Sequence, residues 1–378
     1  MIFFNRLFRG IFLSILAVTA TAGESPLARF VGTPACASSS CHGGAGPQRN
    51  QVGRWESLDV HRRAASTLQV ARSEQIARGL GLTNSLGQST AAQSPRCTVC
   101  HAPNALVPAA ARRVELDATE GVACETCHAP AEPWLRSHTR PGPPRDDFTR
   151  ADKVAAGMRD LRDLRVRANV CVACHENVPR ELLAAGHPEL LFELDGQTRQ
   201  EPRHWVERAG PPAGYQGAQA WLVGQAVAWR EVAWQSKDPA ETSERLVARE
   251  AGLAWLVRRA AQSVGVTDGT PDAVARAVAT RVWTTADTAT VLRVLAGSSE
   301  DFRTPATPVA VQARRAERLV LALDRLLAAS PAATAQAADE ALSSLFQLAQ
   351  WLPDFAPARF AAALEVLSGK LPVSPPVP

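Results

Sequence analysis

The cysteines, and the histidines beside them, are the residues of this chain whose types and spacing specify chemistry most directly. The eight cysteines form four pairs, and a histidine follows the second cysteine of every pair. In chain order, the first to fourth sites are Cys36–Cys41–His42, Cys97–Cys100–His101, Cys124–Cys127–His128 and Cys171–Cys174–His175. Two thiols at this spacing reach the two vinyl groups on one porphyrin edge, and the adjacent imidazole then meets the iron from one face. The pattern predicts four covalently bound haem c groups, each held by one pair and ligated on one side by its histidine.

Three other uses of paired cysteines compete with haem attachment. Structural disulfides suit an exported chain, a zinc ribbon could use the second and third pairs, and a thioredoxin-like motif uses one Cys-x-x-Cys beside a βαβ unit. None of these explains a histidine after every pair. The first site has four residues between its cysteines instead of two, which makes it a weaker match by itself. Its loop of Ala and Ser can still bring both thiols to a haem edge.

The remaining histidines are His61, His138, His187 and His204. Four haems need at most four sixth ligands, so this number allows two histidines on every iron. Methionine is the main alternative, but without its leader the chain holds only Met158. We therefore expect these four histidines to be the distal iron ligands, and we expect low reduction potentials, because histidine in place of methionine lowers the potential. The sequence leaves open which distal histidine serves which haem.

Several segments resemble the tetrahaem cytochrome c-554 family of multihaem cytochromes. They are residues 31–36, the Asp-x-His-x-x-Ala segment at His61, residues 121–128 followed by His138, and residues 186–194 with Gly-His-Pro and Phe-Glu-Leu. The resemblance covers about residues 30–205. It implies a mostly helical fold around closely stacked haems, with electron transfer in the periplasm and mostly two-histidine irons. In the named member one haem lacks a sixth protein ligand, whereas His204 here could supply one. The Cys-x4-Cys site and the long C-terminal extension depart from the family.

The N-terminus has the pattern of a cleaved export signal. Arg6 and Arg9 precede the apolar run 10–20, and residues 20–22 read Ala-Thr-Ala, a small-residue cleavage site. The run is too short to span a bilayer comfortably, since spanning needs about 20 apolar residues. We expect a signal peptide at 1–22 and a periplasmic protein, either free or associated with a membrane complex.

Helices are expected to position the haem sites. We predict a mainly α protein with little regular sheet, in which a tetrahaem domain at 23–210 is followed by an α-helical domain at 211–370 and a Pro-rich disordered tail at 371–378. From about Gln216 cysteine and histidine disappear, and apolar residues recur at helical spacing. The predicted helices of this half lie near 216–236, 239–264, 272–296, 308–329, 334–351 and 357–369.

Two features of the C-terminal half lead to more local predictions. Asp238, followed by Pro239 and Glu241, has the pattern of a helix N-cap. Six tryptophans at mostly helical spacing are expected to be core residues rather than functional ones. They are Trp221, Trp229, Trp234, Trp255, Trp283 and Trp351.

The net charge and the absence of certain motifs argue against several classes of function. The formal net charge of +4 falls to +2 when the leader, with two arginines and no acid, is removed, and to about −6 when four haems bring their propionates. Neither this balance nor any basic cluster suggests nucleic-acid binding. No nucleotide-binding loop or nucleophile elbow is present.

We expect an electron carrier rather than a catalyst, serving redox partners such as a quinol-oxidising complex, a dehydrogenase or a terminal reductase. The alternative is a haem enzyme in which one five-coordinate iron acts on a small nitrogen or oxygen species. That enzyme would need one histidine off its iron. The C-terminal half is either a docking module or a shield for the haems.

Overall fold

The fold is built almost entirely from helices. A computed structural model describes residues 28–47, 49–139, 149–205, 207, 214–267 and 269–372. Within these ranges there is no β-strand beyond two isolated bridges, which join Phe30 to Arg112 and Thr83 to Ser89. The prediction of a mainly α protein with little sheet is confirmed. The expected signal peptide, and residues 373–378 of the expected tail, lie outside the described residues.

Short helices make up the first half of the chain. Its α-helices are α1 (Gln51–Leu58), α2 (Ala71–Gly79), α3 (Pro95–His101), α4 (Cys124–His128), α5 (Arg150–Ala155), α6 (Leu164–His175), α7 (Arg180–Ala184) and α8 (Leu194–Gln200). Its 3-10 helices are η1 (Thr33–Ala35), η2 (His61–Arg63), η3 (Ala65–Gln69), η4 (Ala91–Gln93), η5 (Pro103–Leu106), η6 (Ala109–Ala111) and η7 (Ser137–Thr139). The buried apolar side chains around α1 to α5 form only small separate clusters. Such clusters are too small to stabilise a domain by themselves, as expected where cofactors supply the core.

Longer helices make up the second half. They are α9 (Gly217–Gln235), α10 (Glu244–Ser263), α11 (Pro271–Thr280), α12 (Thr285–Ala296), α13 (Val309–Ala328), α14 (Ala332–Ala349) and α15 (Pro357–Lys370), with η8 (Ser299–Phe302) and η9 (Leu352–Asp354). Each buries an apolar face, as Leu319, Leu323 and Leu326 do on α13. The helices predicted near 216–236, 308–329, 334–351 and 357–369 are confirmed to within two residues.

The predicted helix start at Asp238 is wrong. The Asp238 carbonyl accepts a hydrogen bond from the Glu241 amide, which closes a turn rather than a helix. Ser243 is extended, and its hydroxyl accepts the amide of Leu246, so α10 begins at Glu244. The N-cap of this helix is therefore Ser243 rather than Asp238, because a separate turn at residues 238–241 precedes the helix.

The helix predicted at 272–296 is in fact two helices. Arg281 is extended and ends α11. Thr284 then starts α12 with a capping box, in which its side chain and that of Asp287 each bond the other residue's backbone amide. Trp283, between the two helices, is buried and donates its indole N–H to Thr288.

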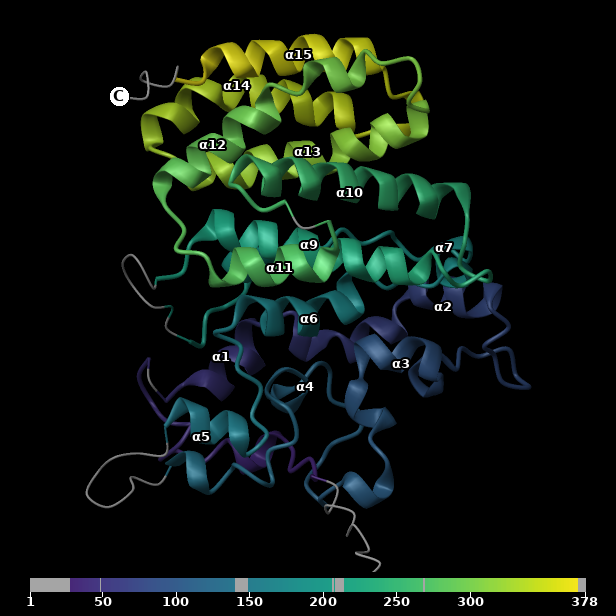
Figure 1. The fold of residues 1–378 in the computed structure, drawn as a ribbon. Coiled ribbons are helices and arrows are strands. Elements are labelled where there is room, and N and C mark those ends of the chain that lie inside the picture. Colours follow the sequence, from purple (N-terminus) through teal and green to yellow (C-terminus); the bar gives the residue numbers. More distant parts are fainter. Residues whose placement is uncertain are drawn as a thin grey trace, which may run out of the picture.

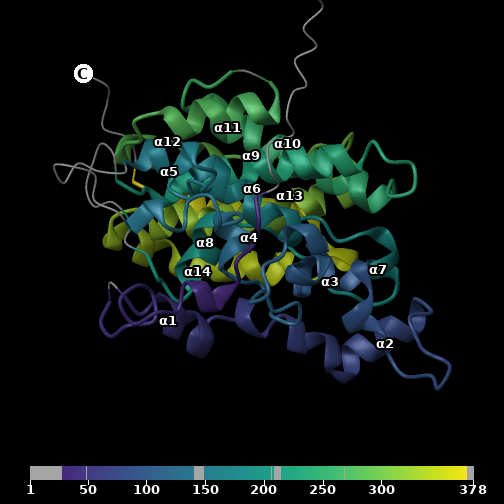
Figure 2. The ribbon, with the colours of Figure 1, turned by 90° about the horizontal axis from the view of Figure 1, so that it is seen from below.

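The helices stack in layers, and one core connects them. In Figure 1, α14 and α15 lie at one end, α12, α13 and α10 follow, and α9 with α11 lies above α6 at the junction with the N-terminal half. In the view of Figure 2, α1 and α2 follow one edge of the molecule. Ala168 and Val172 of α6, together with Phe192 and Leu194, share one core cluster with the helices α9 to α15. Segments on both sides of residue 211 therefore pack into the same core.

The tryptophans of the second half divide into buried, half-buried and exposed residues, and the half-buried one, Trp255, packs against the core. Trp221, Trp229 and Trp283 are buried, as predicted. Trp234 and Trp351 are about two-thirds exposed, so the core prediction is wrong for these two. Both lie at the end of a helix, where neighbouring elements no longer cover the apolar face. Among the described residues, no helix is long and apolar enough to cross a membrane.

Candidate haem sites

The cysteine pairs lie on short helices or at their ends. The second site occupies α3, the third occupies α4, and the fourth forms the last turn of α6, each helix ending at the histidine. In a helix, residues three apart lie on the same face, so both thiols point to one side. The first site follows η1, and its extra residues form an exposed loop through Ser38 and Ser40. In the second, third and fourth sites, helical spacing therefore places two thiols and one imidazole on one face.

Each histidine of a cysteine site faces one of the four other histidines. The ring centroids are 6.1 Å apart for His42 with His138, 6.1 Å for His61 with His175, 6.4 Å for His101 with His187 and 6.4 Å for His128 with His204. All eight histidines therefore fall into four pairs, and each pair combines one predicted proximal with one predicted distal residue. The sequence left this pairing open.

The separation within each pair is suited to a metal ion between the two rings. A bond from a metal to an imidazole nitrogen is about 2 Å long, so two opposed imidazoles on one metal have centroids about 6 Å apart. Direct stacking of rings would allow closer approach. The first pair is nearly parallel, with planes at 4°, and the other three are crossed at 71° to 79°. The residues present thus fit an iron in each of the four gaps.

Hydrogen bonds at Nδ1 orient several of these rings. His138 bonds the carbonyl of Leu135 at 2.7 Å, and His187 bonds that of Pro188 at 2.8 Å. His42 contacts the Gln51 side-chain oxygen at 3.1 Å. A proton held on Nδ1 leaves Nε2 with a free lone pair, which is the form that binds a metal.

Burial keeps most of these imidazoles neutral. It lowers the pKa of His128 to about 4. It also lowers the pKa of four further histidines, His101, His138, His175 and His204. A neutral imidazole is the form that ligates a metal. His61 differs, because its hydrogen bond to Asp59 raises its pKa.

The cysteines also reveal how the sites follow one another in space. Hydrogen bonds join thiols of different sites in two places, Cys36 with Cys124 and Cys100 with Cys174, and raise the pKa of Cys36 and of Cys100. Burial, followed by the charge of Cys127, raises the pKa of Cys171 to about 12. The two hydrogen bonds connect the first site to the third and the second site to the fourth, and the effect of the Cys127 charge on Cys171 indicates that the third site lies near the fourth. The four sites therefore form one row that does not follow chain order.

Two unpaired donors fit the carboxylates of a haem. Arg54 Nε, on α1, and Trp134 Nε1 are buried and have no acceptor among the described residues. Trp134 contacts the ring of His138, with centroids 5.4 Å apart. A buried N–H without an acceptor is costly, and haem propionates are acceptors that would satisfy such groups.

Residues that the sequence did not identify connect the fourth site to the helical half. Glu176 follows His175 directly and is fully buried. Its carboxylate accepts hydrogen bonds from Arg249 of α10, at 2.6 Å, and from Arg318 of α13. Its backbone carbonyl accepts the Gln235 amide at 2.9 Å. The partners lie 59 to 142 residues away along the chain, and no local pattern could have revealed them.

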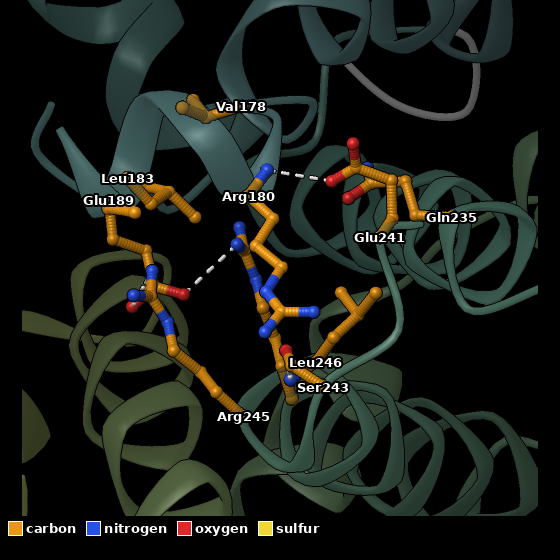
Figure 3. A pocket seen from close by; sticks show the side chains of 11 residues that line it. Val178, Arg180, Leu183, Glu189, Gln235, Glu241, Ser243, Arg245 and Leu246 are labelled. Carbon is orange, nitrogen blue, oxygen red and sulfur yellow. Dashed lines mark hydrogen bonds and ion pairs between the residues drawn. The ribbon is translucent and has the colours of Figure 1, made fainter. Parts of the chain in front are cut away.

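A pocket of about 250 Å³ lies beside this network, between α7 and the start of α10. Figure 3 shows Arg180 beside Glu241 and Arg245 beside Glu189 in this pocket. The Arg180 amide bonds Glu241 at 2.7 Å, and Arg249 bonds Glu189 at 3.0 Å. Glu189 pairs with Arg245 and Arg249, and Glu241 accepts the Arg180 backbone amide. The pocket contains none of the predicted haem ligands. We assign it no ligand.

Two features define the class of protein. Each pair of thiols is followed by a histidine, and that histidine faces a second histidine across a gap that would hold a metal ion. The chain is a c-type cytochrome, an electron-transport protein with covalently bound haem c. Residues 35–129, which carry the first three sites, match the family model described as cytochrome c554 and c-prime. The predicted resemblance is confirmed over this segment, about a quarter of the chain. Comparisons with curated proteins and with solved structures gave no match.

Proposed function

We propose that this chain is a tetrahaem electron carrier that works in the periplasm. The observation that carries the proposal is the set of four histidine pairs, each 6.1 to 6.4 Å between centroids and each beside one cysteine pair. Eight cysteines and eight histidines are the number that four covalently attached, two-histidine haems require. No histidine is left over for another role.

The protein's own residues hold, orient and insulate the cofactors. Bound haem iron supplies one-electron chemistry. The cysteines would hold each haem covalently, and the paired imidazoles would ligate its iron, which would leave no iron open to a substrate. His128 and Cys127 of the third site are half-buried, which limits the access of water there. These roles favour an electron carrier over an enzyme.

The row of sites supports passage of electrons through the molecule. Hydrogen bonds between cysteines, and the electrostatic effect of Cys127 on Cys171, order the sites as first, third, fourth and second. Electrons would enter from one redox protein at one end and leave to another at the other end. We propose a quinol-oxidising complex, a dehydrogenase or a terminal reductase as the partners, and no nucleic acid.

The test is an optical spectrum of the reduced, matured protein before and after carbon monoxide is added, together with a pyridine haemochrome count. We expect four haems per chain and a spectrum that carbon monoxide does not change. The variant His204→Ala should open the third iron, so that part of its spectrum shifts with carbon monoxide. Arg203→Ala, a change at the neighbouring residue, should behave like the wild type.

Two results would contradict the proposal. Fewer than four haems per chain would exclude a tetrahaem protein. A carbon monoxide shift in the wild type would show an open iron and favour the alternative, a haem enzyme acting on a small nitrogen or oxygen species.

A further inference from the structure

His61 differs from the other paired histidines in the groups that face its Nδ1 atom. Asp59 Oδ1 lies 3.0 Å from Nδ1, and the same oxygen accepts the backbone amide of His61 at 2.9 Å. Asp59 is 5% exposed, so this carboxylate is nearly shielded from water. A second carboxylate, that of Glu201, has Oε1 3.6 Å from the same nitrogen. Two acidic groups therefore converge on one imidazole.

The partners described for the other paired histidines are neutral. They are Gln51 for His42, Ala64 and Thr67 for His101, Leu135 for His138, Gln197 for His175 and Pro188 for His187. Glu125, another buried carboxylate near the sites, accepts the backbone amides of Val31, Gly32 and Ala131, and no histidine bond to it is described. Glu176, beside His175, is balanced by two arginines. Among the described hydrogen bonds to these rings, a carboxylate at Nδ1 occurs only at His61. The charge of Asp59 also acts on His204, but no hydrogen bond between these two side chains is described.

A carboxylate at this position acts on the iron in two ways. It draws the Nδ1 proton toward itself, which makes Nε2 a stronger donor to the metal. Its negative charge also favours the oxidised iron, which carries one positive charge more than the reduced iron. Burial strengthens this interaction, because the effective dielectric constant is lower than in water. Both effects lower the reduction potential.

We propose that Asp59 is a positioning residue that makes the haem of the His61–His175 pair the lowest-potential haem of the chain. The proposal rests on the proposed function, since it presumes an iron in that gap. Glu201 adds a smaller effect of the same sign, because it is farther from Nδ1 and more exposed.

The position of this haem in the row has a consequence for electron distribution. The fourth site is the third member of the row, between the third site on one side and the second site on the other. The last haem to be reduced would therefore lie inside the row rather than at an end. The haems of the first and third sites lie on one side of this haem, and the haem of the second site lies on the other. Electrons would fill these three haems before they reduce the haem of the fourth site.

The test is a redox titration of the matured protein and of Asp59→Asn, followed by electron paramagnetic resonance to resolve the individual haems. The asparagine keeps an oxygen acceptor for Nδ1 and removes the charge. We expect the reduction equilibrium constant of the lowest couple to rise about tenfold, which is about 59 mV for a one-electron couple. The couple of the neighbouring His128–His204 pair should rise by less, because the charge of Asp59 also acts on His204, and the other two couples should stay where they are.

Three matched variants make the test decisive. Asp59→Glu retains the negative charge, so the potential of its lowest couple should stay close to that of the wild type. Glu201→Gln should raise the same couple by less, and it remains informative if Asp59→Asn does not fold. Gln51→Glu places a carboxylate beside His42, so it should lower a different couple.

A protein with four haems whose lowest couple is unchanged in both Asp59→Asn and Glu201→Gln would overturn this inference, and so would a shift shared by all four couples. Loss of haems from the wild type would instead count against the proposed function. The haem count and the potentials therefore separate the two failures.

Discussion

Single buried residues connect the cofactor-binding half of this protein to its helical half. Glu176 is adjacent to a predicted iron ligand, yet its carboxylate binds two arginines from helices of the other half. Removing one partner of a buried ion pair leaves an uncompensated charge, which is strongly destabilising. Glu176 should thus contribute to stability through its partners rather than through the haem.

Glu176→Gln is expected to lower the free energy of unfolding by about 3–5 kcal/mol, because Arg249 and Arg318 would lose their shared counter-charge in the interior. Denaturant unfolding of the matured protein measures the loss. Glu74→Gln is the control, since its pair with Arg78 is exposed and should contribute about 0.5 kcal/mol or less. Equal effects of the two changes would contradict this role of Glu176.

Glu193 should make stability depend on pH. Burial raises the pKa of its carboxyl from 4.5 to about 7. Between these values the folded protein binds a proton that the unfolded chain releases, so this group's contribution to stability falls as pH rises from about 4.5 to 7. The fall is at most about 3 kcal/mol.

Glu193→Gln should abolish this dependence, while its side-chain oxygen can still cap α8. Unfolding free energies of both proteins at pH 5, 6 and 7 give the comparison. The difference between variant and wild type should grow in favour of the variant as pH rises. A constant difference would show that Glu193 does not titrate in this range.

Helix boundaries in the second half are set by caps as much as by apolar periodicity. The segment 272–296 has a continuous helical pattern, yet Thr284 and Asp287 cap each other and start a new helix. The reciprocal bonds satisfy backbone amides that a helix start leaves unpaired. The break also allows Trp283 to enter the core.

Thr284→Ala should destabilise the protein by about 1 kcal/mol, because the alanine can neither accept the Asp287 amide nor donate to its carboxylate. Thermal unfolding of the two proteins measures the change. Thr285→Ala, at the exposed neighbouring position, is the control and should have little effect. A loss of stability in the control as large as in Thr284→Ala would argue against the capping box as the cause.

The whole molecule should unfold as one unit, because one core contains residues of both halves. Phe192 and Leu194 lie in the same cluster as the side chains of α9 to α15. Domains that share a core lose it together. The domain boundary expected between residues 210 and 211 remains a prediction. It does not imply that the two halves are stable when separated.

Phe302→Ala tests this cooperativity. Phe302 is fully buried among Trp255, Phe355 and Phe360, in the half that lacks cysteines. Its loss should cost about 3–5 kcal/mol. The unfolding midpoint should fall equally whether it is followed by helical circular dichroism or by the haem absorption band. A haem signal that unfolds at the wild-type midpoint would show that the halves are independent.

Local spacing alone determined the cysteine sites, the number of histidines available to them and most helices of the second half. Cysteines three residues apart, with a histidine directly after the second, form a site through covalent and helical geometry, and apolar periodicity marks a helix face in the same way. The resemblance at residues 35–129 rests on these local patterns.

Only the tertiary structure decided how distant residues combine. It paired His61 with His175 and His128 with His204, ordered the four sites in a row, and brought two arginines to Glu176. It also brought Glu201 close to His61. Packing, burial and hydrogen bonding set these contacts, and they depend on where the chain returns in space rather than on how residues are spaced along it.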